Sequence, residues 1–72
     1  MIKIVVTNVD NFADMIRGIR TARGLSIRET SLKTGIDVST ISRWEHGKRK
    51  PTIDLFERYV SALDVELLLL EK

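Results

Sequence analysis

The chain contains no cysteine, and its 72 residues include only one proline, one histidine and four glycines. The absence of cysteine excludes disulfide bonds and thiolate zinc sites, and it is typical of proteins in a reducing compartment. The longest apolar runs, "IVV" and "LLLL", are far too short to cross a membrane. The N-terminal stretch "MIKIVVTNVD" also lacks the small-residue cleavage site of a signal peptide. We therefore expect a cytoplasmic protein.

The apolar content is nevertheless that of a folded protein. Hydrophobic residues make up 43% of the sequence, which is too high for a disordered chain. A length of 72 residues allows one domain with one small core, and domains of this size often gain stability from a partner chain. We expect a single domain over residues 1–72.

The net charge is only +2, but the basic residues are concentrated in the middle of the chain. Residues 17–50 hold nine of the twelve lysines and arginines and only three acidic residues, a local balance of +6. The flanking segments 1–16 and 51–72 balance at −1 and −3. This distribution is typical of a surface that contacts phosphate groups, although a solvated basic surface would give the same count.

The pattern of caps and apolar residues predicts a mainly α-helical fold of four or five helices with a short strand at each end. Ser26 and Glu29 have the spacing of a capping box, and Gly24 and Gly35 are helix stops. The other expected caps and stops are Asp10 or Asn11, Asp37, Gly47, and Pro51 with Thr52. The predicted elements are a strand at 1–7, helices at 11–23, 26–34, 37–46 and 52–63, and a strand at 65–70.

The C-terminal stretch "VELLLLEK" fits either a fifth helix or a strand. We favour a strand, because the β-branched stretch "IKIVVT" near the N-terminus needs a pairing partner. Only Glu66 is polar between Val65 and Leu70, and a strand that is apolar on both faces must be covered on both faces. One chain has helices for one side only, so we predict a homodimer held partly by the terminal strands. The strands can pair within the chain or across the dimer, and we favour pairing across the dimer.

The helix at 37–46 separates into two faces when its residues are placed at 100° per residue. The core side carries Val38, Ile41, Trp44 and Glu45. The outer side carries Ser39, Ser42, Arg43 and His46, with Thr40 at the margin. Trp44 is thus predicted to pack in the core rather than to contact a ligand. A small, polar outer face fits the major groove of DNA, which is about 12 Å wide, and Arg43 would reach the edge of a guanine there. The alternative is that Arg43 contacts only solvent.

The stretch "GLSIRETSLKTGIDVSTISRWEHGKRKP" resembles the lambda-repressor-like (xenobiotic-response-element type, Cro/repressor) family of helix-turn-helix DNA-binding proteins. The resemblance covers Ile16 to about Val65, and its most specific parts are "GLS", the turn at Gly35 and "TISRWEHGKRKPT". It implies a bundle of four or five helices whose third helix enters the major groove, usually as a dimer on a near-palindromic site.

The same resemblance implies roles for particular residues. It implies base contacts by Val38, Ser39 and Arg43. It implies phosphate contacts by Thr40, Ser42, Lys48, Arg49 and Lys50. It also implies a buried ion pair between Arg20 and Glu45, with a phosphate contact by Arg20 as the alternative.

The chain departs from the family pattern in the helix at 26–34. Ile27 stands where the family commonly has glutamine, so a side-chain phosphate contact is missing, but the backbone N–H groups at this helix start can still hold a phosphate. Thr30 and Ser31 stand where the family usually buries leucine and alanine, and Leu32 stands where it is usually polar. Ile27 and Leu32 are expected to be partly exposed, either as a patch that binds a partner or as scattered surface residues.

Taken together, the sequence favours a sequence-specific DNA-binding regulator, in particular a repressor that binds double-stranded DNA as a homodimer. The alternative is an antitoxin that binds a toxin and represses its own operon. An enzyme is the weakest hypothesis, because His46 is the only histidine and the isolated glycines form no phosphate-binding loop. We expect no cofactor and no metal, and we expect His46 to face solvent or phosphate.

Overall fold

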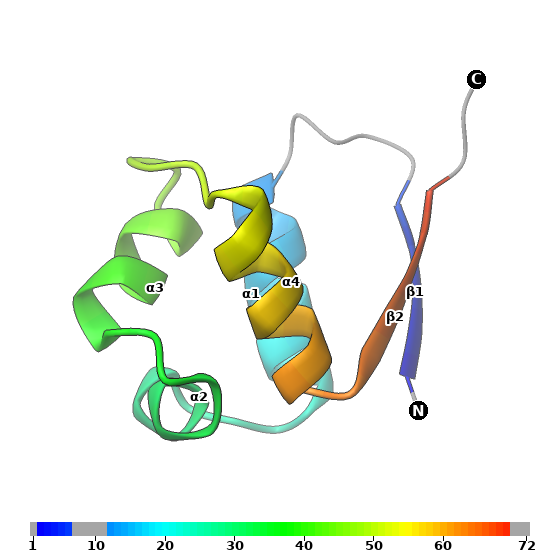
Figure 1. Ribbon diagram of the computed structural model, residues 1–72, viewed down its shortest axis with the longest axis horizontal. Helices are drawn as coiled ribbons and strands as arrows, with labels where there is room; N and C mark the ends of the chain where they lie inside the picture. Colours follow the sequence, from blue (N-terminus) through cyan, green and yellow to red (C-terminus); the bar gives the residue numbers. More distant parts are fainter. Residues whose placement is uncertain (1, 7–11, 70–72) are drawn as a thin grey trace.

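The structure is a computed structural model of the chain, and it describes residues 2–6 and 12–69, with side chains from residue 12 to residue 65. Its elements follow in the order β1 (Ile2–Val6), α1 (Phe12–Ala22), α2 (Ile27–Thr34), α3 (Val38–Glu45), α4 (Ile53–Ala62) and β2 (Val65–Leu69). The predicted mainly helical bundle is confirmed, with four helices in the described residues. Figure 1 shows α3 and the sheet at opposite ends of the longest dimension, with α1 and α4 between them.

Local hydrogen bonds explain where α2 begins and ends. The Ser26 hydroxyl accepts from the Glu29 N–H at 3.0 Å, and the Glu29 carboxylate accepts from the Ser26 N–H at 3.0 Å. This reciprocal pair confirms the predicted capping box. Gly35 ends the helix in the left-handed region, at φ 75°, where its N–H donates to the Ser31 carbonyl at 2.9 Å.

Helices α3 and α4 each begin one residue later and end one residue earlier than predicted, because the flanking residues are their caps. Asp37 and Thr52 are the N-caps of α3 and α4, and His46 and Leu63 are their C-caps. The Thr52 hydroxyl accepts from the Leu55 N–H at 3.2 Å, whereas the Asp37 side chain makes no capping hydrogen bond. The predicted cap at Asp10 or Asn11, and the predicted strand residues 1, 7 and 70, lie outside the described residues.

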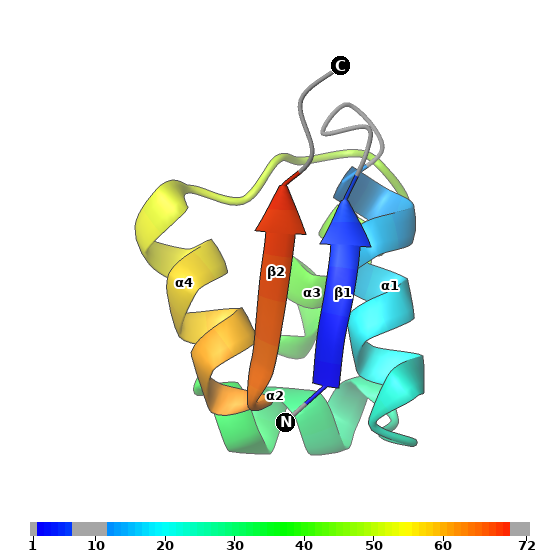
Figure 2. The ribbon, with the colours of Figure 1, turned by 90° about the vertical axis from the view of Figure 1, so that its right-hand side faces the viewer.

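The two strands form a parallel sheet whose register runs from Ile2 opposite Val65 to Val6 opposite Leu69. Residues 65–69 are therefore a strand rather than a fifth helix. The strands pair within one chain, which differs from the expected pairing across a dimer. Figure 2 shows α1 and α4 behind one face of the sheet, while no described helix covers the other face.

The core lies where α1, α3 and α4 meet. It consists of the buried apolar residues Ile16, Ile19, Ile36, Ile41, Trp44, Tyr59, Leu63 and Val65. The rings of Trp44 and Tyr59 meet edge to face, with centroids 6.0 Å apart and an interplanar angle of 74°. The Tyr59 hydroxyl donates to the Ile16 carbonyl at 2.9 Å, so this phenol joins α4 to α1 without leaving a buried polar atom unpaired.

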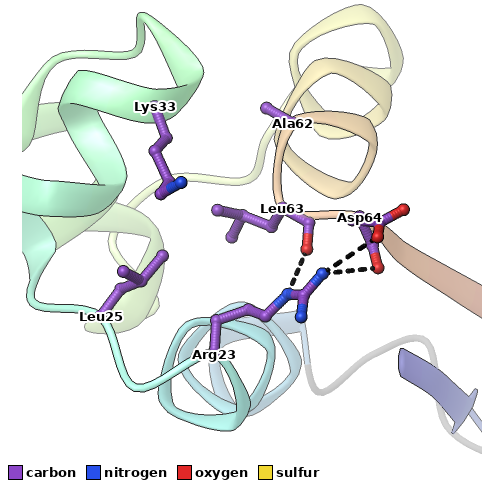
Figure 3. A pocket seen from close by; sticks show the side chains of 6 residues that line it. All are labelled: Arg23, Leu25, Lys33, Ala62, Leu63 and Asp64. Atoms are coloured by element: carbon purple, nitrogen blue, oxygen red, sulfur yellow. Dashed lines mark hydrogen bonds and ion pairs between the residues drawn. The ribbon is translucent and has the colours of Figure 1, made fainter. Parts of the chain in front are cut away.

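The junction between α4 and β2 is held by Arg23, which follows α1 (Figure 3). Its guanidinium donates to the Leu63 carbonyl at 2.6 Å and to the Asp64 carbonyl at 3.2 Å, and it forms an ion pair with the Asp64 carboxylate. Asp64 has φ 55°, a left-handed conformation that aspartate tolerates better than most residues. A hollow of about 390 Å³ lies beside this junction, with Leu25, Lys33 and Ala62 in its wall. Arg23 therefore satisfies the carbonyls at the point where the chain leaves the helices and enters the sheet.

Candidate nucleic-acid interface

The inner face of α3 anchors the helix on the core. Ile41 and Trp44 are 0% and 1% exposed, and Glu45 beside them is 3% exposed. Since these residues recur at a spacing of three to four, the opposite face of the helix turns to solvent. The prediction that Trp44 packs in the core is confirmed.

The outer face of α3 presents small polar side chains and one long cation. Ser39 and Arg43 are exposed and lie four residues apart, so they share one face; Thr40 and Ser42 are half-buried beside them. Val38 is 45% exposed, so its angular assignment to the core side is wrong. It is the first residue of the helix, where the chain has only just turned onto the core. The candidates for base contact therefore lie together on one accessible surface.

A basic loop follows α3 directly. Lys48, Arg49 and Lys50 are all exposed. The loop is tied back to the helix by its backbone, because the Gly47 N–H donates to the Trp44 carbonyl at 3.1 Å and the Lys48 N–H donates to the Arg43 carbonyl at 2.9 Å. Gly47 adopts φ 71°, which makes this tight reversal possible. Three cations thus stand at a fixed place beside the end of α3.

His46 is exposed at the end of α3, and its Nδ1 lies 2.7 Å from the Ser42 carbonyl oxygen. A carbonyl oxygen only accepts, so this hydrogen bond requires the proton on Nδ1. No group of three or more metal-binding side chains exists in the described part of the chain. His46 therefore lies on the surface at the helix end, beside the basic loop.

The start of α2 contributes backbone groups rather than a side chain. Ile27 is half-buried and packs against the core, which agrees with the expected partial exposure. Because Ser26 already satisfies the Glu29 N–H, the N–H groups of Ile27 and Arg28 stay without a partner among the residues that the structure describes. Free N–H groups at a helix start, together with the helix dipole, attract phosphate.

Arg20 and Glu45 form a bidentate ion pair between α1 and α3. Arg20 Nε lies 2.7 Å from Glu45 Oε2, and Arg20 Nη2 lies 2.9 Å from Oε1. The Arg20 side chain is 16% exposed and that of Glu45 is 3% exposed. The hydrogen bond to Glu45 raises the pKa of Arg20 above its usual value. Arg20 also donates to the Leu25 carbonyl at 2.8 Å, so one guanidinium ties the end of α3 to the segment that leads into α2.

The structure shows how α2 accommodates two residues that depart from the family pattern, Thr30 and Leu32. Thr30 is fully buried, and its hydroxyl donates to the Ser26 carbonyl at 2.9 Å, so a polar side chain fills an apolar position without an unpaired atom. Leu32 is 81% exposed, as expected for an apolar residue at a position that is usually polar.

Sequence reasoning missed one residue near this surface, Arg17. Its Nη2 donates to the Glu45 backbone carbonyl at 2.7 Å, and its Nε lies 3.7 Å from the Glu45 carboxylate. The available signal was the spacing of Arg17 and Arg20, which are three residues apart on one helix and therefore face the same neighbour.

Comparison with known proteins supports this description. The family model for helix-turn-helix domains of the HTH_3 type matches residues 16–70. A solved structure of an HTH_3 family transcriptional regulator from Vibrio cholerae is 29% identical with a TM-score of 0.73; the match covers 76% of this chain but only 31% of that protein. The restriction-modification controller protein C.AhdI from Aeromonas hydrophila is 33% identical with a TM-score of 0.71, over 76% of this chain and 83% of that protein. The comparison with curated proteins gave no match.

The fold and the exposed third helix define a helix-turn-helix domain. The chain belongs to the HTH_3 helix-turn-helix family, which is the Cro and repressor type that the sequence resembles. Family membership and these two neighbours support a DNA-binding regulator. None of the helices between residues 12 and 62 has the length and apolar composition of a membrane span.

Proposed function

We propose that this protein is a sequence-specific transcriptional repressor that inserts α3 into the major groove of a near-palindromic operator. The observation that carries the proposal is the orientation of α3. Ile41 and Trp44 hold the helix on the core, while Ser39 and Arg43 stand exposed on its outer face. An exposed helix of this kind fits the major groove, and an arginine can donate two hydrogen bonds to a guanine there.

The surroundings of α3 supply the sequence-independent part of binding. Lys48, Arg49 and Lys50 follow the helix as an exposed cationic loop, and the free N–H groups at the start of α2 offer a second phosphate site. Half-buried Thr40 and Ser42 add hydroxyl groups beside the groove-facing residues. We propose that the protein acts by this binding alone, without catalysing a reaction.

Selection of bound duplexes from a random DNA pool tests the proposed function. We expect enrichment of one sequence with two inverted half-sites, since a dimer with twofold symmetry reads a palindrome. Transcription from a promoter that carries the selected site should fall when the protein is added. A pool without enrichment, at a salt concentration where the protein still binds DNA, would overturn sequence-specific recognition. Activation of the promoter would overturn repression.

We also propose that two copies associate through the terminal strands. β1 and β2 pair with each other and leave their outer edges unpaired among the described residues. A two-stranded sheet is marginally stable alone, and a free strand edge is a template for another strand. Sedimentation of a chain ending at Asp64, compared with the full chain, tests this interface. If the shortened chain keeps its helical content and dimerises as tightly as the full chain, the strands do not hold the dimer.

The alternative function is that of an antitoxin that binds a toxin and represses its own operon. The observation that favours it is the exposure of Leu32 on α2 and Ile53 on α4, at 81% and 78%. Large exposed apolar side chains favour protein contact when they form a patch. Co-expression with the product of the neighbouring gene should then give a stable complex that Leu32→Glu disrupts. A protein that purifies alone and binds its operator fully would speak for the repressor.

A further inference from the structure

The C-terminal end of α3 is held by two arginines of α1, whose hydrogen bonds reach different atoms of Glu45. Arg20 takes the carboxylate through two hydrogen bonds. Arg17 takes the backbone, because its Nη2 donates to the Glu45 carbonyl oxygen at 2.7 Å. Glu45 is the last residue of α3, and the last carbonyls of a helix have no partner inside the helix. Arg17 therefore caps this helix from a neighbouring helix.

The hydrogen bond from Arg17 to the Glu45 carbonyl has a charged donor at a helix C-terminus. A charged guanidinium donates a shorter and stronger hydrogen bond than a neutral group, and a cation at a helix C-terminus interacts favourably with the helix dipole. The Arg17 side chain is 48% exposed, so part of this strength is lost to water. Its Nη1 lies 3.6 Å from the Asp14 carboxylate and its Nε lies 3.7 Å from that of Glu45, so acidic groups already surround its charge.

The capped carbonyl lies close to the groups that would meet DNA. Arg43 stands two residues before Glu45, and Lys48 stands three residues after it. The Lys48 N–H is bonded to the Arg43 carbonyl, so the helix end and the basic loop move together. A shift of this end by a fraction of an ångström would misplace a bidentate contact from Arg43, because two parallel hydrogen bonds to one base tolerate little displacement.

We propose that Arg17 is a positioning residue for DNA recognition: it clamps the last carbonyl of α3 to α1 and so sets where Arg43 and the basic loop face. This inference rests on the proposed DNA-binding function. It assigns Arg17 a role in specificity without a base contact. Arg20 supports the same helix end through the buried carboxylate, so its loss damages the fold, whereas the loss of Arg17 releases the helix end in a protein that stays folded.

The first test needs no DNA. In the free protein, amide hydrogen exchange should accelerate in Arg17→Ala at the N–H groups of His46, Gly47 and Lys48, which close the last turn of α3. We expect about a tenfold acceleration there, and no change at the capped N–H of Glu29 in α2. Arg58→Ala is the matched control, because Arg58 is an exposed arginine on α4 with no partner among the described residues. Unchanged exchange at the end of α3 would overturn the clamp.

The second test measures binding of the selected duplex and of a scrambled duplex at several salt concentrations. Arg17→Ala should weaken the selected duplex by about tenfold and the scrambled duplex by less than about twofold, with an unchanged salt slope. Arg17→Lys keeps one charged donor and should recover part of the loss, whereas Arg58→Ala should match the wild type. Equal weakening on both duplexes, with a salt slope shallower by about 1, would make Arg17 a phosphate contact and overturn the positioning role. A wild-type protein that binds both duplexes equally would overturn the proposed function instead, and amide exchange would still decide the clamp.

Discussion

Arg20 and Glu45 approach within 2.7 Å between Nε and Oε2, and the carboxylate that receives this bond is almost completely buried. A charge in such a place is stable only while its partner is present. Glu45→Ala should therefore lower the free energy of unfolding by about 3–5 kcal/mol, since it leaves the Arg20 guanidinium partly buried and unpaired.

Chemical and thermal unfolding measure this loss. Glu57→Ala, which removes an exposed glutamate from α4, is the control and should change stability by no more than about 0.5 kcal/mol. A melting temperature of Glu45→Ala within about one degree of the wild type would show that the pair contributes nothing to the fold.

The capping box of α2 predicts a pH dependence. Hydrogen bonds from the backbone and side chain of Ser26 lower the pKa of Glu29 below its usual value. A group with a lowered folded-state pKa contributes stability above its unfolded pKa, and this stability is lost as the pH falls through the folded-state value. The Ser26→Ala variant lacks part of the box and should be less stable than the wild type at neutral pH. This difference in the free energy of unfolding should become smaller at acidic pH.

Thr52→Ala is the matched control for this experiment. It removes the cap of α4, where no carboxylate completes a box, and should cost about 1 kcal/mol at every pH. Urea unfolding of both variants between about pH 3 and pH 7 separates them. A constant difference between wild type and Ser26→Ala over this range would contradict the coupling.

Tyr59 predicts a dependence at the opposite end of the pH scale. Burial raises the pKa of Tyr59 well above its usual value, and its hydroxyl donates to the Ile16 carbonyl. Because the folded state holds the neutral phenol, the stability from this group is complete below the unfolded pKa of about 10 and is lost as the pH rises above it. Tyr59→Phe should cost about 1 kcal/mol near neutral pH, where the hydrogen bond is lost.

The difference between Tyr59→Phe and wild type should then shrink as the pH rises from about 9 to 11. The comparison is specific, because the chain contains only one tyrosine. Tyrosinate absorbance that appears in the folded wild type near the ordinary pKa of tyrosine would contradict the buried state of this hydroxyl.

Arg43 and Lys48 should differ in what they contribute to DNA binding. Arg43 stands on the outer face of α3, and Lys48 stands in the loop beside it. Base contacts specify the sequence and phosphate contacts position the protein. Arg43→Ala should cost about 1–3 kcal/mol on the preferred site and relax the choice of one base pair, whereas Lys48→Ala should weaken all sequences alike and reduce the salt slope by about 1.

Titrations of both variants on operator and scrambled duplexes, at several salt concentrations, check this division. If Arg43→Ala weakens both duplexes equally while Lys48→Ala changes the base preference, the two roles are reversed.

The features that the sequence predicted well are local. The capping box joins residues three positions apart, and the inward side of α3 follows from the helical period, so neither needs knowledge of the tertiary fold. Val38 was placed wrongly because the period gives a direction but not the distance to the core. Arg23 was missed because its partner is a backbone carbonyl 40 residues away, and a carbonyl leaves no mark in a sequence. Arg17 also binds a distant carbonyl, 28 residues away, and only its spacing from Arg20 indicated which neighbour it faces. The base and phosphate contacts stay predictions.

The sheet lies at the end of the 34 Å long dimension that is farthest from α3 (Figure 1). Two copies that stack their sheets face to face are related by a twofold axis in the plane of the sheet. The two α3 helices then lie at opposite ends of the dimer, separated by the length of both copies. Two copies that join strand edges in antiparallel fashion are related by an axis perpendicular to the sheet, which keeps both α3 helices on the same side. The position of the sheet thus links the way two copies would associate to the spacing of the half-sites: edge pairing places both α3 helices on one side of the dimer, whereas stacking places them at its two ends.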